Sequence, residues 1–317
     1  MTTGYLKVFR KTFASENEHF LRDARNSCLV RLVLTSDLHF PPEITRLTPL
    51  RDPCGYTDQF YDALPRMVGR VGATKRVDAF VVCGDVYWDW RYFYKFPRVP
   101  RNWDWYNAPL RQLVALRSWL DPKVPLVLVE GNHDLWFRHL EEDGDGRTWV
   151  VSEKYRRFLV ETYRLTWEQA GAVLECLAPG DWEDAVLVEE TYLLRERALA
   201  LGDGVLLYGY PCYDDRFPTE PWTQFRARAA RNYREVLNDA FESGDASPPA
   251  KVLVASHRHP KPVNLYRDFE DPRVDLLAVY WGHYHKVSAA QLRRYSSRGP
   301  YECVMPEVNG FKFVEVT

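Results

Sequence analysis

The chain has 317 residues, of which 46% are hydrophobic and 27% charged, and its net charge at pH 7 is −2. This composition is typical of a globular protein with a sizeable core, in one large α/β domain or two small ones. The near-neutral charge excludes a general electrostatic attraction to nucleic acid or to an anionic membrane surface.

The six cysteines are scattered and form no CxxC pair, so we predict free thiols in a reducing cytosol rather than a disulfide framework. The start of the chain lacks the apolar core of a signal peptide. No apolar run approaches the roughly 20 residues of a membrane span. We therefore expect a cytoplasmic protein with no membrane partner.

Apolar runs and amphipathic stretches alternate along the chain, which predicts an α/β fold. The predicted strands cover residues 28–36, 78–83, 124–130, 205–208, 251–256 and 276–281. The predicted helices cover residues 58–71, 108–120, 152–170 and 221–241. We expect turns and an edge strand over 176–203, and a closing hairpin of 301–305 with 311–316 around Asn309-Gly310.

No internal repeat and no clear linker divides the sequence, so we predict a single domain over residues 1–317, with an N-terminal extension over 1–28. An insertion at 87–106 interleaves four tryptophans with arginines and a lysine. One interpretation is a substrate wall, in which aromatic rings stack on a base and basic groups hold phosphate. The other is a surface that packs on the domain or on a second subunit.

Polar side chains follow five of the predicted strands at the point where each strand ends. In parallel α/β sheets the carboxyl ends of the strands line the ligand crevice, so we expect these side chains to converge. Five of the eight histidines of the chain lie in these short stretches. The candidate residues are Asp37, His39, Asp85, Asn132, His133, His257, His283 and His285.

The spacing at these strand ends suits a shared ligand. Asp37 and His39 are two residues apart, so in an extended chain they point the same way. Gly131 should let the backbone turn sharply, so that the residues after it point into one crevice. At the fourth strand end His259 is a second candidate, and we favour His257 because it leaves the strand directly.

A mixture of imidazole, carboxylate and amide oxygen without a thiolate suits Mn, Fe or Zn and differs from a Cys-rich structural zinc site. The candidates are too many for a single ion. A carboxylate that follows a strand-ending glycine, as Asp85 does, is suited to bridging two ions about 3.5–4 Å apart.

The motifs resemble, in the same order, the pattern of the calcineurin-like metallophosphoesterase superfamily. They are Asp37-Leu38-His39, Gly84-Asp85, Gly131–Asp134, His257 and Gly282–His285. They span residues 37–285, most of the chain. The resemblance implies a four-layer α/β/β/α sandwich with insertions.

The resemblance also implies a role for each matching residue. One divalent metal ion would be held by Asp37, His39, Asp85 and His285, and the other by Asp85, Asn132, His257 and His283. His133 would be the active-site histidine near the phosphoryl oxygen, with Asp134 as its orienting partner.

A family member of this kind would be a hydrolase of a phosphodiester or phosphomonoester, with a hydroxide between the two ions as nucleophile. We expect a small-molecule phosphate ester, such as a nucleotide, as substrate and manganese as the metal. A nuclease of the same superfamily and a non-catalytic scaffold on the same fold are the alternatives. The Arg-Gly pair of the phosphoprotein phosphatases is absent, which disfavours that branch.

Overall fold

The computed structural model describes part of the 317-residue chain. The described residues are 30–39, 77–87, 110, 113–114, 116–142, 149–150, 152–175, 186–188, 190–202, 204–213, 220–258, 269–283, 288–296, 300–304 and 312–316.

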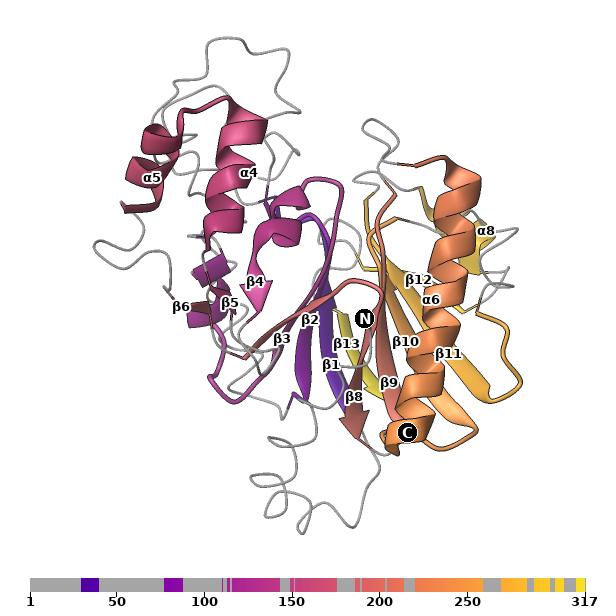
Figure 1. The fold of residues 1–317 in the computed structure, drawn as a ribbon. Coiled ribbons are helices and arrows are strands. Elements are labelled where there is room, and N and C mark those ends of the chain that lie inside the picture. Colours follow the sequence, from indigo (N-terminus) through magenta and orange to yellow (C-terminus); the bar gives the residue numbers. More distant parts are fainter. Residues whose placement is uncertain are drawn as a thin grey trace.

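One five-stranded sheet is formed mainly by the first part of the chain (Figure 1). Its strands, in order across the sheet, are β13 (Lys312–Val316), β1 (Val30–Thr35), β2 (Ala79–Cys83), β3 (Leu126–Val129) and β7 (Thr191–Leu194). The last four run parallel, and β13 runs antiparallel to β1. The apolar runs predicted near 28–36, 78–83 and 124–130 are therefore confirmed as buried strands.

A second five-stranded sheet is formed by the later part of the chain. Its strands, in order, are β12 (Tyr301–Cys303), β11 (Val274–Trp281), β10 (Ala250–Ser256), β9 (Val205–Tyr210) and β8 (Arg197–Gly202). The first four run parallel, and β8 runs antiparallel to β9. The chain passes from β7 to β8 next to Gly209, where a Cβ atom would lie 2.3 Å from the carbonyl oxygen of Leu194.

Helices cover the outer faces of the two sheets. The helical elements with described bounds are η3 (Leu135–His139), α4 (Glu153–Tyr163), α5 (Trp167–Glu175), α6 (Trp222–Ser243) and α8 (Ala289–Ser296). Within the helix predicted over 108–120, the described residues 110, 113–114 and 116–118 are helical. A small sheet of β4 (Glu141–Glu142), β5 (Trp149–Val150) and β6 (Val186–Val188) lies beside the first large sheet. Figure 1 shows α6 along the second sheet and α4 with α5 on the side of the first.

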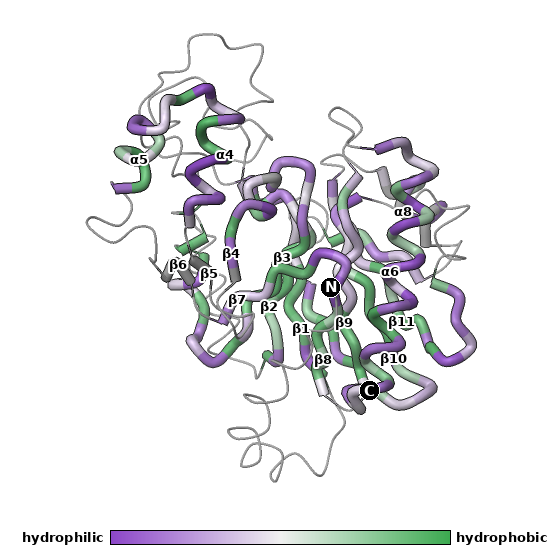
Figure 2. The backbone as a smooth tube through the Cα atoms, in the orientation of Figure 1, coloured by the Kyte–Doolittle hydropathy of each residue, from purple (hydrophilic) through white to green (hydrophobic). Residues whose placement is uncertain are grey.

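Three clusters of buried hydrophobic residues lie between the layers. One lies between the first sheet and its helices, one between the two sheets, and one between the second sheet and α6. Phe80 of β2 belongs to the cluster shared with α4 and α5, whereas its neighbour Val81 belongs to the cluster between the sheets. In β10, Leu253 belongs to the cluster between the sheets and Val254 to the cluster under α6. This alternation follows from the two-residue period of a strand, and Figure 2 shows the hydrophobic strands inside more polar helices. The α/β/β/α sandwich is confirmed.

The predicted helix over 152–170 is wrong as a single element, because the chain forms two helices there. Ser152 caps α4 as expected, its side chain accepting a hydrogen bond from the N–H of Lys154. Arg164 then adopts a left-handed conformation that ends α4. Thr166 and Gln169 exchange side-chain to backbone hydrogen bonds, a capping box that starts α5.

The predicted closing hairpin is also wrong. The first of its strands, β12, pairs in parallel with β11, and the second, β13, pairs antiparallel to β1 in the other sheet. A tight turn at Asn309-Gly310 would have kept the two strands together, but each instead completes the edge of a different sheet. Val316 there joins the cluster between the sheets, so burial of apolar surface outweighs the local turn signal.

Residues 176–203 contain more than the one edge strand that we expected, since β6, β7 and β8 all lie there. The single-domain prediction stays a prediction, because the N-terminal extension (1–28), the helix at 58–71 and nearly all of the insertion (87–106) lie outside the described residues.

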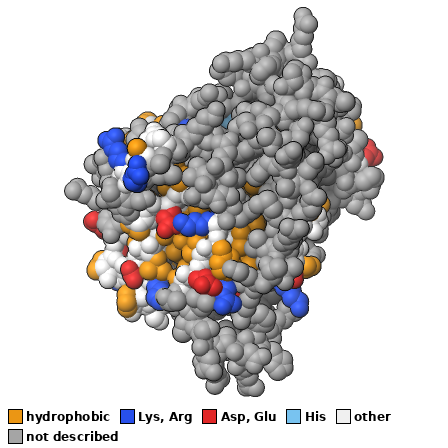
Figure 3. Space-filling model, turned by 180° about the vertical axis from the view of Figure 1, so that it is seen from behind, with side chains coloured by type: hydrophobic (Ala, Val, Ile, Leu, Met, Phe, Trp, Pro, Cys, Tyr) orange, Lys and Arg blue, Asp and Glu red, His pale blue; other side chains and the backbone are white. Residues whose placement is uncertain are grey.

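The visible charge is mixed in sign. On the face seen in Figure 3, the described basic and acidic side chains are interspersed around hydrophobic ones. Among the described residues, no helix is both long and apolar enough to cross a membrane.

We expect Leu253→Ala to lower the free energy of unfolding by about 2–5 kcal/mol, because Leu253 is 1% exposed between the sheets and its truncation leaves a cavity. Val114, 41% exposed, is the control, and Val114→Ala should change the free energy by less than about 0.5 kcal/mol. Urea unfolding measures both. Equal losses in the two variants would contradict a core between the sheets.

Candidate metal centre

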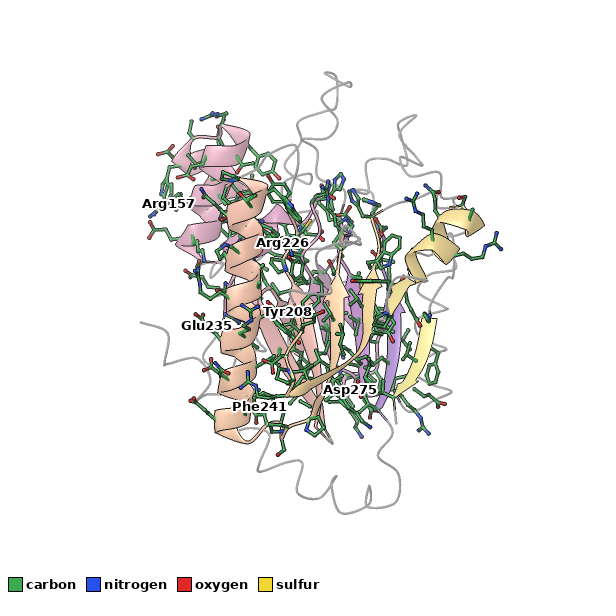
Figure 4. The ribbon with its side chains drawn as sticks, turned by 90° about the vertical axis from the view of Figure 1, so that its right-hand side faces the viewer. Arg157, Tyr208, Arg226, Glu235, Phe241 and Asp275 are labelled. Carbon is green, nitrogen blue, oxygen red and sulfur yellow. The ribbon has the colours of Figure 1, made fainter. Side chains whose placement is uncertain are left out.

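The predicted ligand residues follow strands whose carboxyl ends lie at one edge of the two sheets. Figure 4 shows the second sheet running upward from Asp275, near the amino end of β11, to this edge. The described candidates are Asp37 and His39 after β1, Asp85 after β2, Asn132 and His133 after β3, His257 after β10 and His283 after β11. All but His283 are buried. His285 and the alternative His259 lie outside the described residues.

Four of these residues have a left-handed backbone. The φ angles are 54° at Asp37, 42° at His39, 53° at Asp85 and 74° at His283. Such angles are uncommon outside glycine and concentrate at functional sites. Neighbouring loops hold them, since the N–H of Asp37 donates to the carbonyl of Gly84 and that of His39 to the carbonyl of Asp85, both at 2.9 Å. These two backbone hydrogen bonds thus fix the left-handed backbone from which the side chains of Asp37 and His39 project.

Two glycines at the strand ends are required by close contact. A Cβ atom on Gly131 would lie 2.1 Å from Oδ1 of Asp85. On Gly282 it would lie 1.8 Å from Oγ of Ser36 and 2.3 Å from Oδ2 of Asp37. The turn predicted at Gly131 is present, since the N–H of Asp134 donates to the carbonyl of Gly131 at 3.3 Å. The absent side chain of Gly131 also makes room for the carboxylate of Asp85.

The carboxylate of Asp85 lies in the middle of the site. The backbone N–H of His133 donates to its Oδ1 at 2.9 Å, and Nε2 of His257 lies 3.0 Å from its Oδ2. Two donor groups have their ligand atoms within 4.8 Å of one another, and both include Asp85. They are His39, Asp85 and His133, and Asp85, His257 and His283.

The ring nitrogen Nε2 of His257 is crowded by several polar atoms. It lies 3.0 Å from Oδ2 of Asp85, 3.1 Å from Oδ1 of Asn132 and 3.0 Å from Nδ1 of His283. A single N–H hydrogen cannot serve three acceptors at once, whereas one cation can bind all of these atoms. Carboxylate, imidazole and amide oxygen are also the donors that divalent transition metals take. The residues present therefore fit a metal ion.

Burial and mutual charge set the protonation of the site. Burial raises the pKa of the Asp85 carboxyl, but the charges of His257 and His133 outweigh it and hold the pKa well below the usual range. Burial opposes a charge on His257, yet Asp85 and Asp37 raise its pKa to about 9. Burial and the charge on His257 lower the pKa of His283 to about 3. Without metal, a protonated His257 thus faces the buried carboxylates of Asp85 and Asp37.

Asp134, the predicted partner of His133, is bonded to backbone groups. Its carboxylate accepts hydrogen bonds from the N–H groups of Gly131, Val86 and Tyr87 at 3.1, 3.3 and 3.2 Å. These bonds tie the loop after β3 to the segment after β2. Its role in orienting the His133 ring stays a prediction.

One buried charge next to the site was not predicted. Glu130, 2% exposed at the side chain, ends the apolar run of β3 and binds Arg138 at 2.5 Å and Arg195 at 2.9 Å. The signal was present in the sequence, because a glutamate at the end of a buried strand requires a partner. Its two partners anchor η3 and the passage from β7 to β8 beside the metal centre.

Comparison with known proteins identifies the family of this site. A family model described as calcineurin-like phosphoesterase matches residues 30–287. Among solved structures, TT1561 of Thermus thermophilus is 14% identical with a TM-score of 0.40, over 91% of this chain and 99% of that one. A phosphopantetheinyl hydrolase from Mycobacterium tuberculosis is 12% identical with a TM-score of 0.33, over 89% and 95%. No curated protein matches.

We expect Gly282→Ala to lower metal affinity at least about 10-fold, because its Cβ atom would displace Ser36 and Asp37. Gly244→Ala is the control, since its Cβ atom meets nothing within 4 Å. Its positive φ predicts a loss of about 1 kcal/mol of stability without a change in metal affinity. Titration of the metal-free proteins with Mn²⁺ measures this, and equal affinities in the two variants would contradict the close packing.

The pKa of His257 predicts how stability depends on pH. In the metal-free protein His257 has a pKa of about 9, against 6.5 for an ordinary histidine, so its proton stabilises the fold fully below pH 6.5. This contribution, up to about 3 kcal/mol, should be lost as the pH rises from 6.5 to about 9. The pKa of His283 is lowered, so this residue is neutral in both states over that window.

Urea unfolding between pH 6 and 9 with a chelator measures this loss, and His257→Gln should remove it. Stabilisation by added Mn²⁺ should instead grow over the same window, because metal and proton compete for one nitrogen. A metal-free protein that gains stability toward pH 9 would contradict the assignment.

Proposed function

Because the chain belongs to the calcineurin-like phosphoesterase family, we propose that it uses two divalent metal ions that share Asp85 to hydrolyse a phosphate ester of a small molecule. The family makes the chain a phosphate ester hydrolase, and the proposal concerns its metal centre and its substrate. The observation that carries it is the pair of donor groups with Asp85 in common.

The ligand sets in this proposal follow the family motif. The second set contains all of the second donor group. The first set shares His39 and Asp85 with the first donor group, and His133 of that group is given a role beside the ions instead. The first ion is held by Asp37, His39, Asp85 and His285. The second is held by Asp85, Asn132, His257 and His283. Asn132 contributes a neutral oxygen, so the site gains a ligand without further negative charge that would repel an anionic substrate. Manganese suits this mixture of oxygen and imidazole donors.

Two ions in such a site would activate a water molecule and neutralise the phosphoryl oxygens. His133 acts beside them. Burial lowers its pKa well below that of an ordinary histidine, so the imidazole is neutral near pH 7. A neutral ring donates one hydrogen bond from N–H, and in this proposal that bond goes to a phosphoryl oxygen in the transition state. Its backbone N–H meanwhile holds Asp85 at 2.9 Å.

A nucleotide or another small phosphate ester is the proposed substrate class. Nucleic-acid enzymes gather basic side chains on one face, whereas the net charge here is −2 and the described charges seen in Figure 3 are of both signs. We also propose a cytoplasmic location, where the buried thiols of Cys83, Cys212 and Cys303 would stay reduced.

The test is hydrolysis of bis-p-nitrophenyl phosphate and p-nitrophenyl phosphate by the metal-stripped protein, before and after addition of Mn²⁺. We expect activity only with metal, and a loss of at least about 100-fold in Asp85→Asn, because even supporting residues of metal sites cost 10–100-fold. The exposed Asp239→Asn is the matched control and should keep wild-type activity. The ratio of the two rates distinguishes a diesterase from a monoesterase.

Counting bound metal per chain completes this experiment. Two ions in the wild type and fewer in Asp85→Asn support the shared carboxylate. A single ion in the wild type, or equal activity of Asp85→Asn and the wild type, would overturn the two-metal proposal.

A further inference from the structure

Ser36 lies between β1 and the first predicted ligand, and its side chain is fully enclosed. Both Ser36 and Asp37 are 0% exposed. The hydroxyl Oγ of Ser36 lies 2.5 Å from Oδ2 of Asp37 and 2.7 Å from the carbonyl oxygen of Cys83. Both are acceptors, so the single hydroxyl hydrogen can be donated to only one of them at a time, and the charged carboxylate at the shorter distance is the stronger acceptor. A hydrogen bond from a hydroxyl to a carboxylate at this distance is charge-assisted and strong.

The same carboxylate oxygen has a second donor from the other sheet. The backbone N–H of His283, after β11, donates to Oδ2 of Asp37 at 2.8 Å. Oδ2 is thereby held by two donors, while Oδ1 faces Nε2 of His39 at 3.7 Å. The Asp37 carboxylate is consequently fixed in one orientation, with a defined oxygen toward the first donor group.

The carbonyl of Cys83 connects this arrangement to the second donor group. Besides the Ser36 hydroxyl it contacts Nδ1 of His257 at 3.0 Å. A carbonyl oxygen only accepts, so Nδ1 must carry the hydrogen and Nε2 is the nitrogen turned toward Asp85. One hydroxyl and one carbonyl thus orient a ligand of each proposed ion.

We infer that Ser36 is a positioning residue of the metal centre, which holds Asp37 in the orientation that binds the first ion. This inference rests on the proposed function, because it presumes that Asp37 is a ligand. Gly282 supports it, since a side chain there would strike Oγ of Ser36 at 1.8 Å. The absence of a side chain at Gly282 therefore leaves room for the hydroxyl of Ser36.

A purely structural role would have different consequences. If the hydroxyl of Ser36 only bonded to the carbonyl of Cys83 at the end of β2, removing the hydroxyl would lower the stability of the fold and leave metal affinity unchanged. Removal of a supporting hydrogen bond to a metal ligand instead lowers affinity by about 10–100-fold. Metal affinity, measured apart from activity, therefore separates the two roles.

The experiment is calorimetric titration of the metal-free full chain with Mn²⁺. We expect Ser36→Ala to weaken one of the two sites about 10–100-fold and to leave the other unchanged. The affected site should be the one that Asp37→Asn also weakens, and the double variant should lose no more than Asp37→Asn alone. Saturating Mn²⁺ should restore most of the hydrolytic activity of Ser36→Ala.

The neighbouring Thr35 provides a matched control. It is also 0% exposed, and its hydroxyl has no hydrogen-bond partner among the described residues, so Thr35→Val should bind both ions as the wild type does. Ser36→Cys, which keeps nearly the same volume with a weaker donor, replaces Ser36→Ala if that variant does not fold, and should also weaken one site.

The two proposals fail in different ways. A wild type that binds fewer than two ions overturns the two-metal proposal. A wild type that binds two ions, with Ser36→Ala or Ser36→Cys binding both equally well, overturns the role of Ser36 alone.

Discussion

The structure depends on bringing one buried carboxylate within reach of ligands from two separate sheets. Asp85 follows a strand of the first sheet, yet His257 of the second lies 3.0 Å from it. This contact requires the ends of strands in different sheets to approach closely. Glycine is therefore needed at 84, where a Cβ atom would lie 2.6 Å from the side chain of His257, and at 282, where it would meet Ser36 and Asp37. Three features bring these side chains together. The strands are parallel, glycines follow their carboxyl ends, and several of the candidate residues have a left-handed backbone.

Burial makes the charges of the site interdependent. A buried carboxylate or imidazolium is costly alone, and each is tolerated here because the others are near. The pKa of Asp85 falls and that of His257 rises for the same reason, namely their mutual attraction. A divalent ion would take the place of the proton on His257 and offset the negative charge of the carboxylates. Without metal, that proton offsets the same charge, so the site is stabilised in both states.

Much of the fold and of the site could be predicted, because buried parallel strands are continuous apolar runs and their polar ends stand out. Asp37, Asp85 and His257 stand out in this way as candidates, and their roles as ligands stay predictions. The pairing of strands that are distant in the sequence could not be predicted, since no local signal indicates which sheet a strand joins. For that reason the Asn309-Gly310 pair led to the wrong prediction of a closing hairpin. Ser36 was missed because a serine becomes informative only once Cys83 and Asp37 are known to lie beside it.

The proposed ligands come from both sheets, so a metal ion bound to them would connect the two halves of the sandwich, each half being one sheet with its helices. Of the proposed ligands, Asp37, Asp85 and Asn132 follow strands of one sheet and His257 and His283 follow strands of the other, so neither sheet alone would supply the proposed ligand set. Metal binding and the docking of the halves are therefore thermodynamically linked, and each favours the other. Any motion that parts the sheets at this edge must release an ion, so the loaded protein resists opening where its chemistry takes place.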